Sequence, residues 1–349
     1  MARYIGLDVH CASSTAAVVN KRGKRVCSEV LQTNGEALVQ FVKRQSRPVE
    51  VCLEEGVQSG WLVEVLSPHV ANVVVTTVSR RGGSKSDADD ALQLARRLAA
   101  GDIERPVYKS VGAYAQLRQL VKAHRFVTQD TVRMQNRIKA IYRSRGVTVA
   151  GDSVYRATKR EMWLEQLPPH ARQTATLLYT AYDALRATRD NALEAVAREC
   201  GKHPIFGVLT SCSGIGTLRA AQLMAIVVTP HRFRNRQQFW AYCGLGVVMR
   251  SSSDWVQQPN GAWMRAPVQQ TRGLNRNHNH LLKHVFKGAA TTVISARSDN
   301  AFRTAYARLL EGGTKPNLAK LTIARKIAAT ILAMWKRNEA YDEKRSREA

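Results

Sequence analysis

Four acidic side chains stand where a strongly basic chain has little reason to place them. Asp8 lies inside an apolar run near the N-terminus, and Glu54 closes a later apolar run. Asp87 and Asp90 begin a segment with helical spacing. A carboxylate in a buried strand is costly unless it is paired or bound to a metal, and carboxylate oxygens are the ligands that Mg²⁺ and Mn²⁺ prefer. We therefore predict that the four side chains converge on Mg²⁺ or Mn²⁺ and cut nucleic acid.

Two of these acids have a second explanation. Asp87 and Asp90 are three residues apart, so they share one face of a first helical turn, with Ser86 as the expected N-cap. Acids in a first turn also complement the helix dipole without taking part in any chemistry. Asp8 has no such structural reason to be acidic, because it lies within a predicted strand. The chemical interpretation of the set therefore depends on Asp8.

The order of the predicted elements is that of an RNase H-like α/β domain. In that fold the fourth strand lies parallel to and beside the first, and neighbouring strands are about 5 Å apart. Asp8 and Glu54 are therefore expected to face each other across this pair of strands. The expected strands are residues 3–9, 14–20, 25–31, 49–53 and 70–75, and the expected helices are residues 35–44, residues 61–66 and a helix from Asp87 onward.

The charge balance indicates a nucleic-acid partner. The chain has 53 Lys and Arg residues against 27 Asp and Glu residues, which is a formal net charge of +26. An excess of this size implies a polyanion that is bound through its phosphates, and solubility alone needs far less charge. No apolar run approaches the roughly 20 residues that span a bilayer, so we expect no membrane association.

The cysteines exclude two classes of site. The six cysteines include no C-x-x-C pair, so neither a zinc site nor a disulfide framework is expected. The chain begins directly with a strand-like run, which leaves no room for a signal peptide. We expect a cytoplasmic, nucleoid-associated protein.

The second half of the chain is predicted to be mainly helical and basic. A long basic helix is expected at residues 111–145. Residues 170–199 carry an apolar stripe from Leu177 to Val196 that is typical of an antiparallel coiled-coil arm, and such an arm also suits a dimer contact. Further basic helices are expected at residues 275–287 and 318–336, and a Pro-Asn-Gly turn at residues 259–261 favours an extended hairpin.

Residues 213–221 look like a helix-hairpin-helix turn. Its glycines would let backbone N–H groups approach a phosphate at a helix N-terminus. The alternative is a tight interhelical turn with no ligand. The candidate nucleic-acid-binding residues of the whole chain are Arg118, Lys122, Arg125, Gly214, Gly216, Arg219, Arg234, Arg236, Arg272, Arg276 and Lys283.

Five short motifs occur in an order that carries a resemblance. They are Tyr-Ile-Gly-Leu-Asp-Val-His at residues 4–10, Leu-Glu-Glu-Gly at 53–56, Lys-Ser-Asp-Ala-Asp-Asp-Ala at 85–91, Ser-Gly-Ile-Gly at 213–216 and Tyr-Cys-Gly-Leu at 242–245. With these motifs the chain resembles the DEDD insertion-sequence transposases related to the Piv DNA invertases, over nearly its full length. The resemblance implies a RuvC-like nuclease domain at residues 1–148, a coiled-coil insert at 149–200 and a mainly α C-terminal transposase domain at 201–349.

The resemblance also implies residue roles and partners. It places an acidic catalytic tetrad on Asp8, Glu54, Asp87 and Asp90, with Glu55 as an alternative to Glu54. It places a nucleophilic serine on Ser252, with Ser251 and Ser253 as alternatives. The implied partners are donor and target DNA, a noncoding bridge RNA that pairs with both, and further copies of the chain in a dimer or tetramer. Two other functions stay open: an RNase H-like nuclease or resolvase that uses activated water, and a non-catalytic nucleic-acid-binding protein.

Overall fold

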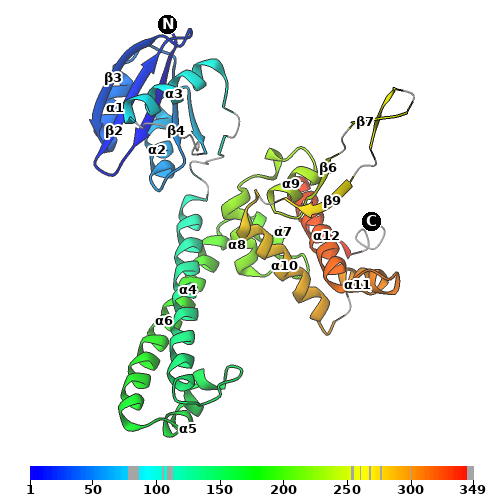
Figure 1. Cartoon of the computed structure of the whole chain (residues 1–349). Coiled ribbons are helices and arrows are strands. Elements are labelled where there is room, and N and C mark those ends of the chain that lie inside the picture. The colour runs from blue at the N-terminus through cyan, green and yellow to red at the C-terminus, as the bar shows by residue number, and fades with distance from the viewer. Residues whose placement is uncertain are drawn as a thin grey trace. The chain divides into compact units, whose positions relative to one another are not determined.

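The computed structural model describes most of the chain, in two compact units. The described residues are 1–77, 86–103, 106–107, 112, 114–252, 255–259, 261–266, 269–275, 277–298 and 300–343, without the side chains of residues 249–252 and 269–272. The units are Met1–Ala113 and Tyr114–Ala349 (Figure 1). The long basic helix therefore belongs to the second unit, whereas the sequence analysis groups it with the nuclease domain.

The first unit is built on a five-stranded sheet in the order β3-β2-β1-β4-β5. β2 runs antiparallel to β1 and β3, while β4 runs parallel to β1 and β5. The predicted RNase H-like order, with the fourth strand beside the first, is confirmed. The elements are β1 (Arg3–Val9), β2 (Ser13–Val19), β3 (Arg25–Gln32), α1 (Gly35–Lys43), β4 (Val49–Glu54), α2 (Ser59–Leu66), the 3-10 turn η1 (Ser67–His69), β5 (Asn72–Thr76) and α3 (Asp87–Ala100).

Helices cover both faces of this sheet. Ile5 and Leu7 of β1 are fully buried in one cluster with Phe41 of α1 and Leu62 of α2. Cys52 of β4 lies in a separate cluster with Leu94 and Leu98 of α3. Side chains alternate between the two faces of a strand, so α3 packs on the face opposite α1 and α2. The even-numbered residues of β1 and β4 lie on the α3 face. Asp8 and Glu54 are among them.

The second unit begins with two long antiparallel helices, α4 (Ala115–Arg143) and α6 (Pro169–Gly201), joined through the short helix α5 (Arg160–Glu165) and the 3-10 turns η2 (Ser153–Tyr155) and η3 (Ala157–Lys159). Tyr142 of α4 is fully buried, and its hydroxyl lies 3.0 Å from that of Tyr179 of α6. The predicted contact stripe is wrong at one position: Leu177 is 66% exposed. The face of α6 that is buried in this cluster carries Ala171, Ala175, Tyr179 and Tyr182.

The remainder of the second unit is a helical core with an added β-hairpin. Its helices are α7 (Ile205–Thr210), α8 (Thr217–Val227), the 3-10 turn η4 (Pro230–Arg232), α9 (Arg236–Tyr242), α10 (His280–Ser295), α11 (Ala301–Glu311) and α12 (Pro316–Arg337). Its strands are β6 (Val247–Ser252), β7 (Trp255–Gln257), β8 (Trp263–Arg265) and β9 (Gln269–Leu274). β6 pairs with β9 and β7 with β8, both antiparallel, so the predicted extended hairpin is confirmed.

None of the helices in the described part of the chain has the length and apolar character that crossing a bilayer requires.

Candidate active site

Asp8 owes its position to a close contact between β1 and α3. A Cβ on Gly6 would stand 2.0 Å from the backbone oxygen of Ala91 and 2.6 Å from the backbone nitrogen of Ala95. Only glycine at this position therefore allows α3 to lie against the strand. Asp8, two residues later on the same face, comes to lie beside the N-terminus of α3 with 21% of its side chain exposed.

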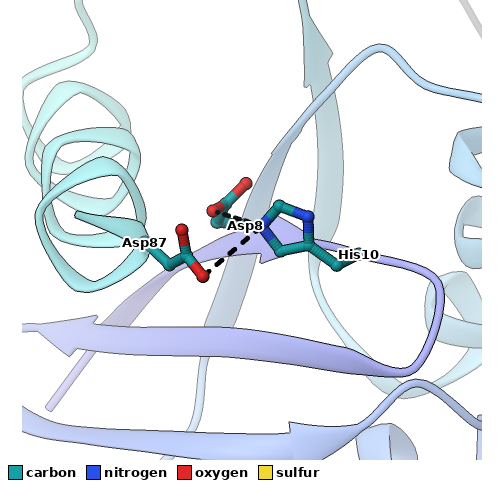
Figure 2. Close-up of side chains that lie close together, drawn as sticks. All are labelled: Asp8, His10 and Asp87. Carbon is teal, nitrogen blue, oxygen red and sulfur yellow. Dashed lines mark ion pairs between the residues drawn. The ribbon is translucent and has the colours of Figure 1, made fainter. Parts of the chain in front are cut away.

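The side chains of His10 and Asp87 meet beside Asp8. His10 Nε2 lies 3.3 Å from Asp8 Oδ2 and 3.5 Å from Asp87 Oδ2 (Figure 2). One ligand atom from each of the three residues lies within 4.8 Å of the other two. The backbone of His10 is held in place, because its N–H donates to Ser13 O and its carbonyl accepts from Thr33 Oγ1.

The other two predicted acids lie close to this cluster. Leu7 pairs with Leu53 in the parallel ladder, which places Glu54 next to Asp8 on the adjacent strand. Asp8 and Glu54 both line a cavity of about 160 Å³. Asp90 is exposed in the first turn of α3 and is close enough to Asp8 to influence its pKa. All four predicted acids are thus brought to one end of the sheet.

The electrostatics of Asp8 reflect this crowding. Burial is the largest cause that raises the pKa of Asp8 above its ordinary value, and the neighbouring carboxylates of Asp87 and Asp90 raise it further, whereas His10 lowers it. Like charges held together around a half-buried carboxylate are unfavourable unless a cation offsets them. The carboxylate oxygens of the cluster fit a divalent cation, and the His10 imidazole contacts two of these carboxylates.

The alternatives for this cluster can be compared on its geometry. Ser86 occupies the N-cap of α3, but its side chain makes no capping hydrogen bond among the described contacts. Asp87 pairs with His10, which lies beyond the end of β1, so it does more than complement the dipole of its own helix. Glu55 is exposed and lines the same cavity as Glu54. Glu54, as the last residue of β4, is the one that continues the Asp8 face of the sheet.

His10 was missed as a site residue, although it belongs to the quoted N-terminal motif. The available signal was its place in that motif, two residues after Asp8 and just past the predicted strand of residues 3–9. The predicted ligand set contains the acids alone. The structure adds an imidazole that contacts two of them.

The predicted serine lies on the hairpin of the second unit. Ser252 is the last residue of β6, and its backbone pairs with Gln269 of β9. Ser251 precedes it and pairs with Gln270. The side chains of Ser251 and Ser252 lie outside the described part of the structure, and Ser253 lies outside it altogether.

The predicted basic residues of α4 and of the α9 region lie mostly on the surface. Lys122 and Arg125 are exposed on α4. Lys122 Nζ and Arg125 Cζ each lie 5.6 Å from the ring centre of Phe126. Arg236 of α9 lies 5.5 Å from the ring centre of Trp240. Of the other predicted arginines and lysines, Arg118 on α4 and Lys283 on α10 are half-buried, and Arg234 before α9 is exposed. The backbone of Arg272 lies in β9, and Arg276 lies outside the described residues.

The Ser-Gly-Ile-Gly motif forms the turn between α7 and α8, and it is occupied by the protein itself. Gly214 has a φ of +84°, and a Cβ there would lie 2.9 Å from Ala289 O of α10. Gly216 is the N-cap residue of α8. Arg219 is half-buried and donates from Nη1 to Gly214 O at 2.6 Å and to Thr292 Oγ1 at 3.1 Å. These contacts favour the tight-turn alternative for Gly214 and give Arg219 a structural role.

Two family models match the chain. A model for the DEDD domain of IS110 transposases, described as a transposase, matches residues 5–144. A second model, described as the transposase IS116/IS110/IS902 family, matches residues 207–264. The first range includes all four acids of the cluster, and the second includes Ser252. A comparison with curated proteins finds no match. The two matched ranges together span more than half of the chain, which therefore belongs to the IS110 family of transposases, enzymes that cleave and rejoin DNA.

Proposed function

We propose that this transposase breaks and joins DNA strands by metal-dependent phosphoryl transfer at the acidic cluster. The observation that carries the proposal is the meeting of Asp8 and Asp87, which are far apart in sequence, on one imidazole nitrogen at 3.3 Å and 3.5 Å. DEDD transposases typically use a divalent metal. Mg²⁺ or Mn²⁺, held by Asp8, Glu54, Asp87 and Asp90, would stabilise charge on the attacking and leaving oxygens of an in-line displacement at phosphorus.

Each residue of the cluster has its own part in this proposal. The side chain of Asp8 is less exposed than those of His10 and Asp87, so Asp8 fixes the position of the site relative to the sheet. Glu54 adds a carboxylate from the neighbouring strand, and Asp87 and Asp90 add two from the first turn of α3. His10 orients the carboxylates of Asp8 and Asp87 toward a single point through its Nε2 atom.

The proposed nucleophile of the strand-transfer step is Ser252. Its hydroxyl oxygen would form a bond to a DNA phosphorus while the bond to the leaving DNA oxygen breaks, and the resulting phosphoserine link would conserve the bond energy for rejoining. Support comes from the position of Ser252 within the second family-matched range and at the end of a strand in a hairpin. Ser251 and Ser253 remain the alternative nucleophiles.

We further propose that a noncoding bridge RNA guides the reaction and that the active assembly is a dimer or tetramer. The formal net charge of +26 supports binding to more nucleic acid than one DNA site. Lys122 and Arg125, exposed side by side with Phe126 on α4, are suited to contact phosphates and stacked bases. Removal of RNA should then abolish target choice while leaving the acidic cluster able to bind metal.

The competing function is a nuclease of the same fold that uses water. The two functions are distinguished by trapping the protein–DNA adduct under denaturing conditions and mapping the attached peptide. Recombination through serine predicts an adduct on Ser252, lost in Ser252→Ala and retained in Ser251→Ala and Ser253→Ala. Cleavage by Ser252→Ala with no adduct in the unsubstituted protein would establish the water-using nuclease instead.

A further inference from the structure

The tip of the hairpin exposes large apolar side chains on both faces. Trp255 is 58% exposed and Trp263 is 61% exposed, while Val256 and Met264 are 48% and 60% exposed. Within the part of the chain that the structure describes, none of the four belongs to a hydrophobic cluster. Exposed tryptophans that the fold does not use commonly mark a binding surface.

The strand register places the two tryptophans on the same face. Trp255 pairs with Arg265, and Gln257 pairs with Trp263. Directly paired residues, and residues two apart, lie on one face of a hairpin. The guanidinium carbon of Arg265 lies 5.5 Å from the ring centre of Trp255. We call the surface formed by Trp255, Trp263 and Arg265 the indole face. Val256 and Met264 form the opposite face.

More than half of each indole on this face is exposed, although Arg265 packs against Trp255. β7 and β8 have three residues each, and a two-stranded hairpin of that length is marginally stable in water. The exposed area of both indoles stays available to a ligand. A flat aromatic surface with an adjacent guanidinium suits planar rings that carry negative charge nearby, and unpaired nucleotides have both properties.

The charge of Arg265 and the flat indole surfaces favour nucleotides over a protein partner as the ligand. Arg265 is the one charged residue among the described positions of the hairpin tip between Trp255 and Ala266, so these positions carry a net positive charge. The enzyme cleaves and rejoins DNA, and a cut strand end is able to leave its duplex. Bases in an intact duplex are stacked on each other and offer no free ring face. Unpaired bases offer that face.

We propose that the indole face binds unpaired nucleotides, with bases stacked on Trp255 and Trp263 and with Arg265 beside a phosphate. This inference concerns how a strand is held, and it depends on neither the acidic cluster nor the identity of the nucleophile. It assigns a strand-binding role to residues that lie beyond the predicted basic positions.

The test measures binding by the full-length protein in the presence of a chelator, so that no strand is cut. A fluorescently labelled single strand and the duplex of the same sequence are compared by anisotropy. Stacking on an aromatic side chain contributes about tenfold or more in affinity for each base. Trp255→Ala with Trp263→Ala should therefore weaken single-strand binding by at least about tenfold and leave duplex binding nearly unchanged. Trp255→Phe with Trp263→Phe should retain most of the affinity, because phenylalanine keeps an aromatic face.

The opposite face of the same hairpin provides the matched control. Val256→Ala with Met264→Ala truncates the two exposed apolar side chains of the opposite face without changing the indole face, and it should keep single-strand affinity close to that of the unsubstituted protein. Equal losses in the two double variants would overturn the proposal, as would no loss in the tryptophan variant. A change of oligomeric state in the tryptophan variant, with single-strand affinity retained, would assign the indole face to a contact between copies of the chain and would also overturn it.

Discussion

Gly6 of β1 and Ala91 of α3 lie so close that a Cβ on Gly6 would stand 2.0 Å from the Ala91 oxygen. This contact brings the acidic first turn of α3 against the strand that carries Asp8. The position of the cluster therefore depends on a residue with no side chain.

Gly6→Ala should displace α3 and separate Asp87 and Asp90 from Asp8. The new methyl group meets backbone atoms, which cannot rotate away, so we expect a loss of about 3 kcal/mol in the free energy of unfolding. The DNA cleavage rate should fall by more than the loss of folded protein accounts for. Chemical denaturation and a cleavage assay measure the two effects. Gly60→Ala is the matched control, since a Cβ there meets nothing within 4 Å; wild-type behaviour of Gly6→Ala would contradict this account of α3.

His10→Ala should raise the metal concentration needed for cleavage. His10 contacts both Asp8 and Asp87, and loss of a group that orients metal ligands typically weakens metal affinity by about 10- to 100-fold. Titration of Mn²⁺ against cleavage rate gives the half-saturating concentration. The maximal rate at saturating metal should be reduced far less. An unchanged metal requirement would show that His10 is a bystander.

His124 should make the protein less stable in mildly acidic solution. Its side chain is buried in α4, and burial, followed by the charge of Arg189, lowers its pKa below 6.5, whereas Asp190 opposes the shift. The unfolded chain therefore takes up a proton as pH falls through about 6.5, while the folded chain stays neutral until the lowered pKa is reached. The free energy of unfolding should fall across that interval. Urea denaturation at several pH values should show a shallower slope for His124→Gln than for the exposed control His170→Gln.

Arg219→Gln should destabilise the second unit. The Arg219 guanidinium donates to Gly214 O and to Thr292 Oγ1, which ties the α7–α8 turn to α10. Hydrogen bonds from a charged donor contribute about 1.5 to 3 kcal/mol. Thermal unfolding should shift to lower temperature, and Thr292→Val should cause a smaller shift because one of the two bonds remains. Reduced DNA affinity at unchanged unfolding temperature would instead support the phosphate-binding role expected from sequence.

The first unit was largely predictable because its strands are short apolar runs separated by turn residues. The pairing of β4 beside β1 follows from the element order, and it predicts that Asp8 lies next to Glu54, as the structure has them. His10 was harder to assign, because a histidine just past a strand end has many structural uses. The turn that follows β1 directs the His10 side chain toward Asp87, and the strand pattern does not predict that direction.

The second unit was less predictable because its helices have more than one apolar face. Leu177 belongs to a plausible stripe on α6, yet the buried face in contact with α4 carries Tyr179 and Tyr182. A stripe shows that a helix packs, and it does not show which neighbour it meets. α11 was not predicted, although Ala305, Tyr306 and Leu309 follow the buried Phe302 at helical spacing and pack against the core.

The central claim, that the four acids surround one metal site, is tested most directly by iron-mediated cleavage of the protein backbone. Fe²⁺ substituted at the site, with ascorbate and peroxide, produces radicals that cut the chain close to the ion. We expect cuts near Asp8, Glu54 and Asp87, suppressed by excess Mg²⁺ and lost in Asp8→Asn. Cuts elsewhere in the chain, or the same cuts in Asp8→Asn at full strength, would contradict it.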